Sequence, residues 1–204
     1  MRGLMSAMLA GAIVLLASQA RAEDSSMIIA VFTKNTTNPA YSAFRLAADQ
    51  VGQATGARIL HFVPKQPDNV DEQKAMVEQV LKDRPDAVVF IPVDDVAMIE
   101  SVKKLNEAKI PVVLAANPLP GDFVTFVGAD DFKIGYAQAR YLFDKLGGKG
   151  RIVILEGTAG APTNRERLRG YKQALSEAPG IEVLASGVGN YQQTDGKRVM
   201  AAFL

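Results

Sequence analysis

Polar side chains that can bind neighbouring hydroxyl groups follow several of the predicted strands. Asn38, Asn117 and Arg165 can each present two donors, or a donor and an acceptor, to adjacent hydroxyls. Tyr41 adds an aromatic ring, which can lie against the apolar face of a sugar ring. This combination of residue types is typical of binding a small polar ligand.

Each of these residues also has a purely structural explanation, and the sequence alone leaves both open. Asn38 can cap the helix that follows it, Tyr41 can belong to a core, and Asn117 can make a turn with the proline after it. Arg165 can lie on a solvated helix face. Residues 165–169 carry three arginines near a predicted helix N-terminus, where positive charge opposes the helix dipole, so a role beyond helix stability would explain them.

Motifs for the common enzyme chemistries are absent from the sequence. Residues 34–39, after the first predicted strand, lack the glycines that a dinucleotide site needs, and neither Gly-Lys pair precedes Ser or Thr as in a phosphate-binding loop. The single histidine, His61, lies in the middle of a strand without a Gly-x-Ser-x-Gly partner, so we expect a structural role for it. The sequence therefore predicts a protein that is not an enzyme and uses neither cofactor nor metal.

The composition narrows the classes of protein further. The 204 residues are 48% apolar and 22% charged, which is typical of a folded globular chain. With 23 basic and 22 acidic side chains and no basic run, the pattern expected for nucleic-acid binding is missing. The absence of Cys excludes disulfides, thiolate metal sites and a cysteine nucleophile.

The helices and strands that would position these side chains are predicted from two hydrophobic patterns that alternate along the sequence. Apolar runs of strand length alternate with segments whose apolar residues recur every three to four positions, as in amphipathic helices. The predicted strands are residues 27–33, 57–63, 86–92, 110–115, 123–127, 151–155 and 181–186. The predicted helices begin at Asn38–Pro39, at Asn69 with Glu72 as a capping box, near Val96, near Gly135, at Asn164 and near Gln193. Right-handed crossovers then predict an α/β fold of doubly wound βα units, whose ligand site lies at the carboxyl ends of parallel strands.

The first 22 residues have the features of a secretory signal peptide. Arg2 precedes an apolar run from Leu4 to Ala17, and Ala20-Arg21-Ala22 offers small residues at the positions that signal peptidase reads. The run of 14 residues is too short for a transmembrane helix, which needs about 20. We therefore expect cleavage after Ala22 and a soluble chain exported to the periplasm.

The motifs, taken in order, resemble those of one family. They are the first strand followed by Asn38-Pro39, Gln73 to Asp83 followed by Pro85-Asp86-Ala87, Ile91-Pro92-Val93-Asp94, Ala108 to Val113, Val127 to Asp131, Glu156-Gly157, Arg165-Glu166-Arg167 and Gly170-Tyr171. This succession is similar to that of the ribose-type periplasmic sugar-binding proteins of ABC importers, and the likeness runs from Met27 almost to the last residue.

The resemblance implies two parallel-sheet lobes that clamp a small sugar between them. The first lobe would be residues 23–127 and the second residues 128–204. By position, the ligand-binding residues would be Lys34, Asn38, Tyr41, Asn117 and Arg165. The implied partners are the membrane permease and ATPase of the importer, and the implied state is a monomer. A periplasmic sensor that presents the sugar to a chemoreceptor or kinase remains the alternative, whereas a sugar-responsive repressor would carry a helix-turn-helix where this chain has the signal sequence.

Three departures from the family pattern limit what the resemblance predicts. Ala116 stands where many relatives have an Asp or Asn that binds two hydroxyls, and Ala40 stands where an aromatic residue often follows Asn-Pro. A pentose such as ribose is therefore not assumed. Family members also continue well past the helix near Gln193, so we expect a truncated chain whose second lobe is incomplete.

Overall fold

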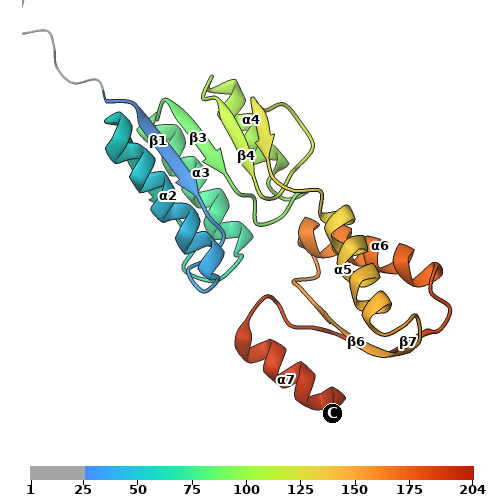
Figure 1. Cartoon of the computed structure of the whole chain (residues 1–204). Helices are drawn as coiled ribbons and strands as arrows, with labels where there is room; N and C mark the ends of the chain where they lie inside the picture. The colour runs from blue at the N-terminus through green and yellow to red at the C-terminus, as the bar shows by residue number, and fades with distance from the viewer. Residues whose placement is uncertain (1–25) are drawn as a thin grey trace, which may run out of the picture.

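The computed structural model describes residues 26–204 and shows two α/β lobes joined end to end (Figure 1). We call β1–β5 with α2–α4 the first lobe, and β6–β7 with α5–α7 the second lobe. The predicted signal peptide, residues 1–22, lies outside the described residues. Among the described residues, no helix combines the length and apolar character needed to cross a bilayer.

The first lobe is built on a five-stranded parallel sheet with strand order β2-β1-β3-β4-β5. Its strands are β1 (Ile28–Phe32), β2 (Arg58–Phe62), β3 (Ala87–Phe90), β4 (Val112–Ala115) and β5 (Thr125–Val127). Its helices are α2 (Pro39–Thr55), α3 (Val70–Asp83) and α4 (Ile99–Glu107). Every adjacent pair of strands is parallel, so the predicted α/β architecture is confirmed.

One face of this sheet carries the main hydrophobic core. Phe32 and Phe90, from the adjacent strands β1 and β3, are fully buried with ring centroids 4.9 Å apart. Val77 of α3 and Leu105 of α4 pack against this face and are fully buried as well. The continuous apolar runs of the strands are explained by this burial.

The predicted helix signals at the start of the chain are largely confirmed. The Asn38 side chain caps α2 by accepting a hydrogen bond from the backbone N–H of Ala40 (3.0 Å), and Gly56 ends the helix in the left-handed conformation. Asn69 caps α3 as predicted, but Glu72 completes no reciprocal capping box. Its carboxylate instead accepts from the backbone N–H of Lys65, which fixes the loop before the helix.

The apolar stripe of α2 is less buried than the periodicity predicts. Val51 is 55% exposed, and with Phe44 it lines an apolar groove between α2 and the sheet residues Val31 and Val89. No other described helix covers this part of the sheet. The spacing of the apolar residues therefore predicted which face of α2 packs against the sheet, but it did not predict how completely that face is covered.

The second lobe has a two-stranded parallel sheet covered on one face by a close helix pair. The strands are β6 (Gly150–Glu156) and β7 (Ile181–Val188), and the helices are α5 (Asp131–Lys145), α6 (Pro162–Ser176) and α7 (Gln193–Phe203). Gly135 and Gly170 bring α5 and α6 into backbone contact, because a Cβ at Gly170 would lie 2.3 Å from the carbonyl oxygen of Phe132. Phe143 and Ala174 form the centre of the small core beneath them.

The strands of the second lobe are not buried between helices as predicted. Leu155 of β6 is 47% exposed and Leu184 of β7 is 53% exposed. The described residues supply helices α5 and α6 on one face, and the short α7 lies against only part of the other. The predicted layering therefore holds for one face of this sheet only.

Candidate ligand site between the lobes

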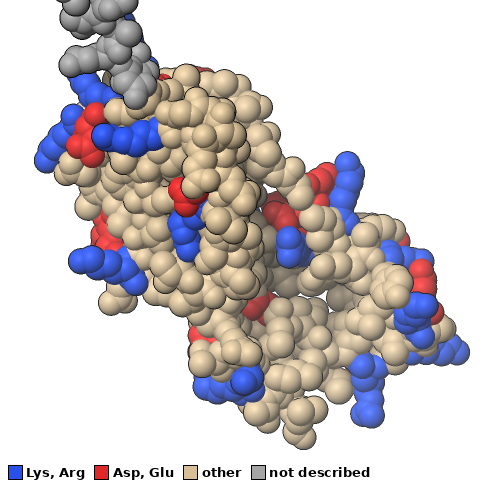
Figure 2. All heavy atoms as spheres, turned by 60° about the vertical axis from the view of Figure 1, so that its left-hand side comes forward, with Lys and Arg blue, Asp and Glu red and all other residues tan. Residues whose placement is uncertain are grey.

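The strands of the first lobe run toward the second lobe (Figure 1), and a hollow lies between the two lobes in the molecular surface (Figure 2). Side-chain hydrogen bonds join three pairs of residues across the lobes here, which are Asp95 with Arg165, Asn117 with Thr163, and Thr37 with Gln192. This is the place where ligands bind in open parallel α/β sheets. We call the hollow the interlobe cleft.

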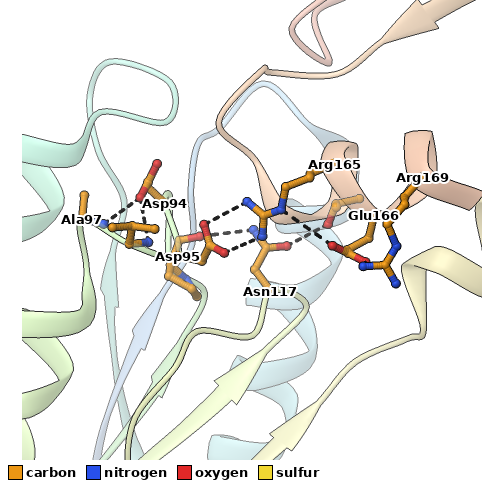
Figure 3. A network of polar contacts seen from close by, with 10 residues as sticks. Asp94, Asp95, Ala97, Asn117, Arg165, Glu166 and Arg169 are labelled. Carbon is orange, nitrogen blue, oxygen red and sulfur yellow. Dashed lines mark hydrogen bonds and ion pairs between the residues drawn. The ribbon is translucent and has the colours of Figure 1, made fainter.

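Arg165 makes the strongest of these contacts. It lies one turn into α6, and both of its terminal nitrogens reach Asp95, at 2.6 Å from Nη2 to Oδ2 and 3.4 Å from Nη1 to Oδ1 (Figure 3). The hydrogen bond to Asp95 raises the pKa of Arg165. The Arg165 side chain is still 51% exposed, so its pair with Asp95 remains in contact with solvent.

Asn117 is positioned by a tight turn at the end of β4. Ala116 has φ 58°, a left-handed conformation that is uncommon for a residue with a Cβ, and the N–H of Asn117 donates to the carbonyl of Ala115 at 2.6 Å. The turn buries the Asn117 amide, which donates to the Pro92 carbonyl and accepts from the hydroxyl of Thr163. Asn117 therefore links the two lobes directly (Figure 3).

Asn38 is the predicted site residue that the structure places least clearly in the cleft. Its side-chain oxygen is used as the cap of α2, and its backbone N–H donates to Asn35 Oδ1 at 2.9 Å. Asn35 in turn donates to Asp68, so these residues form one rigid loop. Asn38 has no hydrogen bond to the second lobe among the described residues.

Tyr41 and Tyr191 bring aromatic rings to the site from opposite lobes. Burial raises the pKa of Tyr41, and the nearby Asp68 and Tyr191 raise it further. Burial likewise raises the pKa of Tyr191 to about 12. The ring of Tyr191 lies over Gly157, where a Cβ would be 2.0 Å from Cζ, and 41% of Tyr191 is exposed. The two tyrosines thus provide apolar surface near the polar network.

Lys34 lies two residues after the end of β1 and is almost entirely buried. Its backbone carbonyl accepts from the N–H of Asp68, which ties the loop after β2 to the end of β1. Burial lowers the pKa of the Lys34 ammonium, while Asp68 and Asp94 oppose this shift. The structure thus places Lys34 among carboxylates at the carboxyl edge of the sheet.

The arginines of α6 each have an acidic partner. Beyond Arg165, the Nε of Arg167 lies 2.8 Å from Asp131 of α5, and Arg169 lies 2.9 Å from Glu166. The helix begins at Pro162, two residues earlier than predicted, because proline is favoured at the first helical position. The positive charges of Arg165 and Arg167 near the helix N-terminus oppose the helix dipole, but each is paired with an acidic side chain of another element.

Sequence reasoning missed Thr163, Asp95 and Tyr191. Asp95 follows a predicted strand, and its position at the carboxyl end was the available signal. Tyr191 had weaker signals, because its place depends on left-handed backbone conformations at Asn190 and Tyr191, which residues with a Cβ rarely adopt. No cluster of three or more metal-ligating His, Cys, Asp or Glu side chains occurs within residues 26–204.

The chain belongs to the family of periplasmic binding protein domains, because residues 29–204 match the model of that family. It is 28% identical over 177 residues to the ribose import binding protein RbsB of Salmonella typhimurium, an alignment that covers 86% of this chain and 59% of the relative. It is 32% identical over 129 residues to a xylitol-binding protein of Mycolicibacterium smegmatis, covering 62% of this chain and 37% of the relative.

Solved structures of solute-binding proteins have the same fold as this chain. A periplasmic solute-binding protein of an ABC transporter from Actinobacillus succinogenes, with bound D-allose, matches at a TM-score of 0.82 and 26% identity, covering 88% of this chain and 65% of the other. A solute-binding protein from Burkholderia graminis in complex with D-arabinose matches at a TM-score of 0.84 and 21% identity, covering 89% and 63%. The chain therefore spans less than two thirds of the length of these relatives.

Proposed function

We propose that this protein binds a small sugar or a similar polyol in the interlobe cleft and delivers it to an ABC-type permease. The observation that supports this proposal most strongly is the polar network of Asp95, Asn117, Thr163 and Arg165, which joins the lobes at the carboxyl ends of the strands. Planar amide, carboxylate and guanidinium groups bind pairs of hydroxyls well. The relatives are binding proteins, and the ligands mentioned in their names or found in their structures are sugars or polyols. This is consistent with a protein that binds a ligand and is not an enzyme.

In the proposed complex, the ligand binds through groups of both lobes. Arg165 and Asn117 would donate to its hydroxyls, and Lys34 would add a third donor. Tyr41 and Tyr191 would contact its apolar faces. Asn38 would act indirectly, because its oxygen caps α2 and holds Tyr41 in the first turn of that helix. The proposal also divides the chain between residues 127 and 128 into two lobes that move relative to one another.

A panel of neutral monosaccharides and polyols tests the binding proposal. Ligand-detected NMR, which registers weak complexes, is expected to show binding of at least one member to the purified chain. Arg165→Ala should weaken that affinity by about 1–3 kcal/mol, because ligand hydroxyls lose their donors. Arg169→Ala is the matched control, since Arg169 pairs with Glu166 of its own helix and lies over the ring of Phe132, and both of these residues belong to the second lobe. Equal effects of the two substitutions would remove Arg165 from the site.

Export and delivery need separate tests. We propose that residues 1–22 direct export and are removed, and that the protein acts as a monomer in the periplasm. The intact mass of the protein recovered from the periplasm should show an N-terminus at Glu23, and a retained N-terminus would contradict this. Uptake of a labelled ligand by vesicles that contain the permease should depend on the protein. A ligand-dependent response of a chemoreceptor or kinase without uptake would instead indicate a sensor.

A further inference from the structure

The side-chain ammonium of Lys34 is buried without a hydrogen bond or ion pair to another described residue. The residue is only 3% exposed, yet within residues 26–204 its Nζ takes part in no hydrogen bond or ion pair. No buried side-chain nitrogen or oxygen in this part of the chain is left without a partner, so the nitrogen must still reach solvent. Lys34 lies two residues after the end of β1, at the carboxyl edge of the sheet, which borders the interlobe cleft.

The carboxylates around Lys34 are engaged by other groups. Asp68 Oδ1 accepts from the amide of Asn35 at 3.0 Å, and Asp94 Oδ1 accepts from the N–H groups of Val96 and Ala97 at 2.8 and 2.7 Å. Figure 3 shows Asp94 turned toward these N–H groups. The two acids therefore act on Lys34 at longer range, where they favour its charged form but leave its three donors unused.

The third nearby acid, Asp95, is paired with Arg165. The charge of Asp95 is therefore balanced by the second lobe, and it does not compensate Lys34. An ammonium that is buried further by lobe closure loses hydration, and this is costly unless it gains acceptors. A ligand in the cleft can supply acceptors for Lys34 once water is expelled.

We infer that the ligand of this site is a sugar acid, in which a carboxylate of the ligand accepts hydrogen bonds from Lys34. The inference rests on the proposed function and names its substrate class. A hydroxyl group can also accept from an ammonium, but a carboxylate adds the attraction between two full and opposite charges to the hydrogen bond. The hydroxyls of the same ligand bind Asn117 and Arg165.

Matched pairs of ligands test this inference directly. In each pair a carboxylate replaces a hydroxymethyl group: D-galacturonate with D-galactose, D-glucuronate with D-glucose, and D-gluconate with D-glucitol. Affinities are measured by ligand-detected NMR titration for the natural sequence and for Lys34→Met, which keeps the length of the side chain but removes its charge. Lys65→Met is the control, because it removes the same charge from an exposed loop residue.

The expected result is that at least one acid binds about 10- to 100-fold more tightly than its neutral partner. Lys34→Met should abolish this preference, because it should weaken binding of the acid about 10- to 100-fold more than binding of its neutral partner, while Lys65→Met should preserve the preference. If a neutral sugar binds as tightly as its acid, or if Lys34→Met leaves the preference unchanged, the inference is wrong and the proposed function stands. If no member of any pair binds, the proposed function itself fails.

Discussion

The two lobes bring site residues to the same cleft from very different frameworks. In the first lobe, Phe32 and Phe90 lie on central strands of a five-stranded sheet and are fully buried. In the second lobe, β6 and β7 form a two-stranded sheet, and Leu155 remains half-exposed. The site residues of the first lobe thus follow strands of a rigid core, whereas those of the second lobe depend on the packing of α5 against α6. The free energy of local unfolding should therefore be higher in the first lobe than in the second.

The largest expected effects come from the two cores. Phe90→Ala should lower the free energy of unfolding by about 5 kcal/mol, at the upper end for such cavities, because the central sheet cannot collapse around the lost ring. Phe143→Ala in the second lobe should cost about 3 kcal/mol, since its half-exposed surroundings can relax. Urea denaturation followed by circular dichroism measures both, and a larger loss for Phe143→Ala would reverse the comparison.

A smaller effect is expected at the contact between α5 and α6. Gly170→Ala should destabilise the second lobe by about 1–3 kcal/mol, because the added Cβ would meet the backbone of Phe132 and Tyr136. Gly196→Ala in α7 is the control, since no atom lies within 4 Å of its Cβ position. Amide hydrogen exchange of β6 and β7 should accelerate only for Gly170→Ala. Unchanged exchange in both variants would show that α5 and α6 do not determine the stability of this lobe.

The link between the lobes should contribute less than either core. A double-mutant cycle of Asp95→Ala and Arg165→Ala is expected to give a coupling energy of about 1 kcal/mol or less, because Arg165 is half-exposed and water screens the pair. Urea denaturation of the four proteins in low and high salt measures it, and the coupling should fall in high salt. A coupling that salt does not change would mean that the pair is more shielded from water than the geometry indicates.

The weakest expected signal is a change of stability with pH in the alkaline range. Burial raises the pKa of Tyr191 to about 12, above its ordinary value of 10.0, so the folded state favours the neutral phenol. The associated stability is fully present below pH 10 and is lost as the pH rises toward about 12. Tyr191→Phe should flatten this part of the profile in thermal denaturation. The same slope in both proteins would assign it to other groups.

The sequence predicted the first lobe better than the second for a physical reason. Strands such as Ile28–Phe32 are short apolar runs with clear caps and turns around them, and both signals are local. The incomplete burial of Val51 and Leu155 depends on which elements cover each sheet face, and no local pattern carries that information. Periodicity therefore predicted the elements correctly and the layers only in part.

The site shows the same division between local and distant information. Asn117 and Arg165 could be proposed from their places after a strand and at a helix start, and the structure brings them into one network. The residue opposite Arg165, Asp95, lies 70 positions away in the sequence, so its pairing needs the folded chain. The capping role of Asn38 was foreseen as one of two alternatives, and the structure favours it.

Closure of the two lobes around a ligand is the central claim of this account, and a distance between the lobes tests it most directly. Because the chain has no Cys, spin labels can be attached at two introduced cysteines, Lys82→Cys on α3 and Lys172→Cys on α6, which are both exposed positions. Pulsed electron paramagnetic resonance then measures the separation with and without a bound sugar. We expect a sugar to shorten and narrow the distance distribution, and Arg165→Ala to weaken this response. A ligand that binds without changing the distribution would contradict the claim.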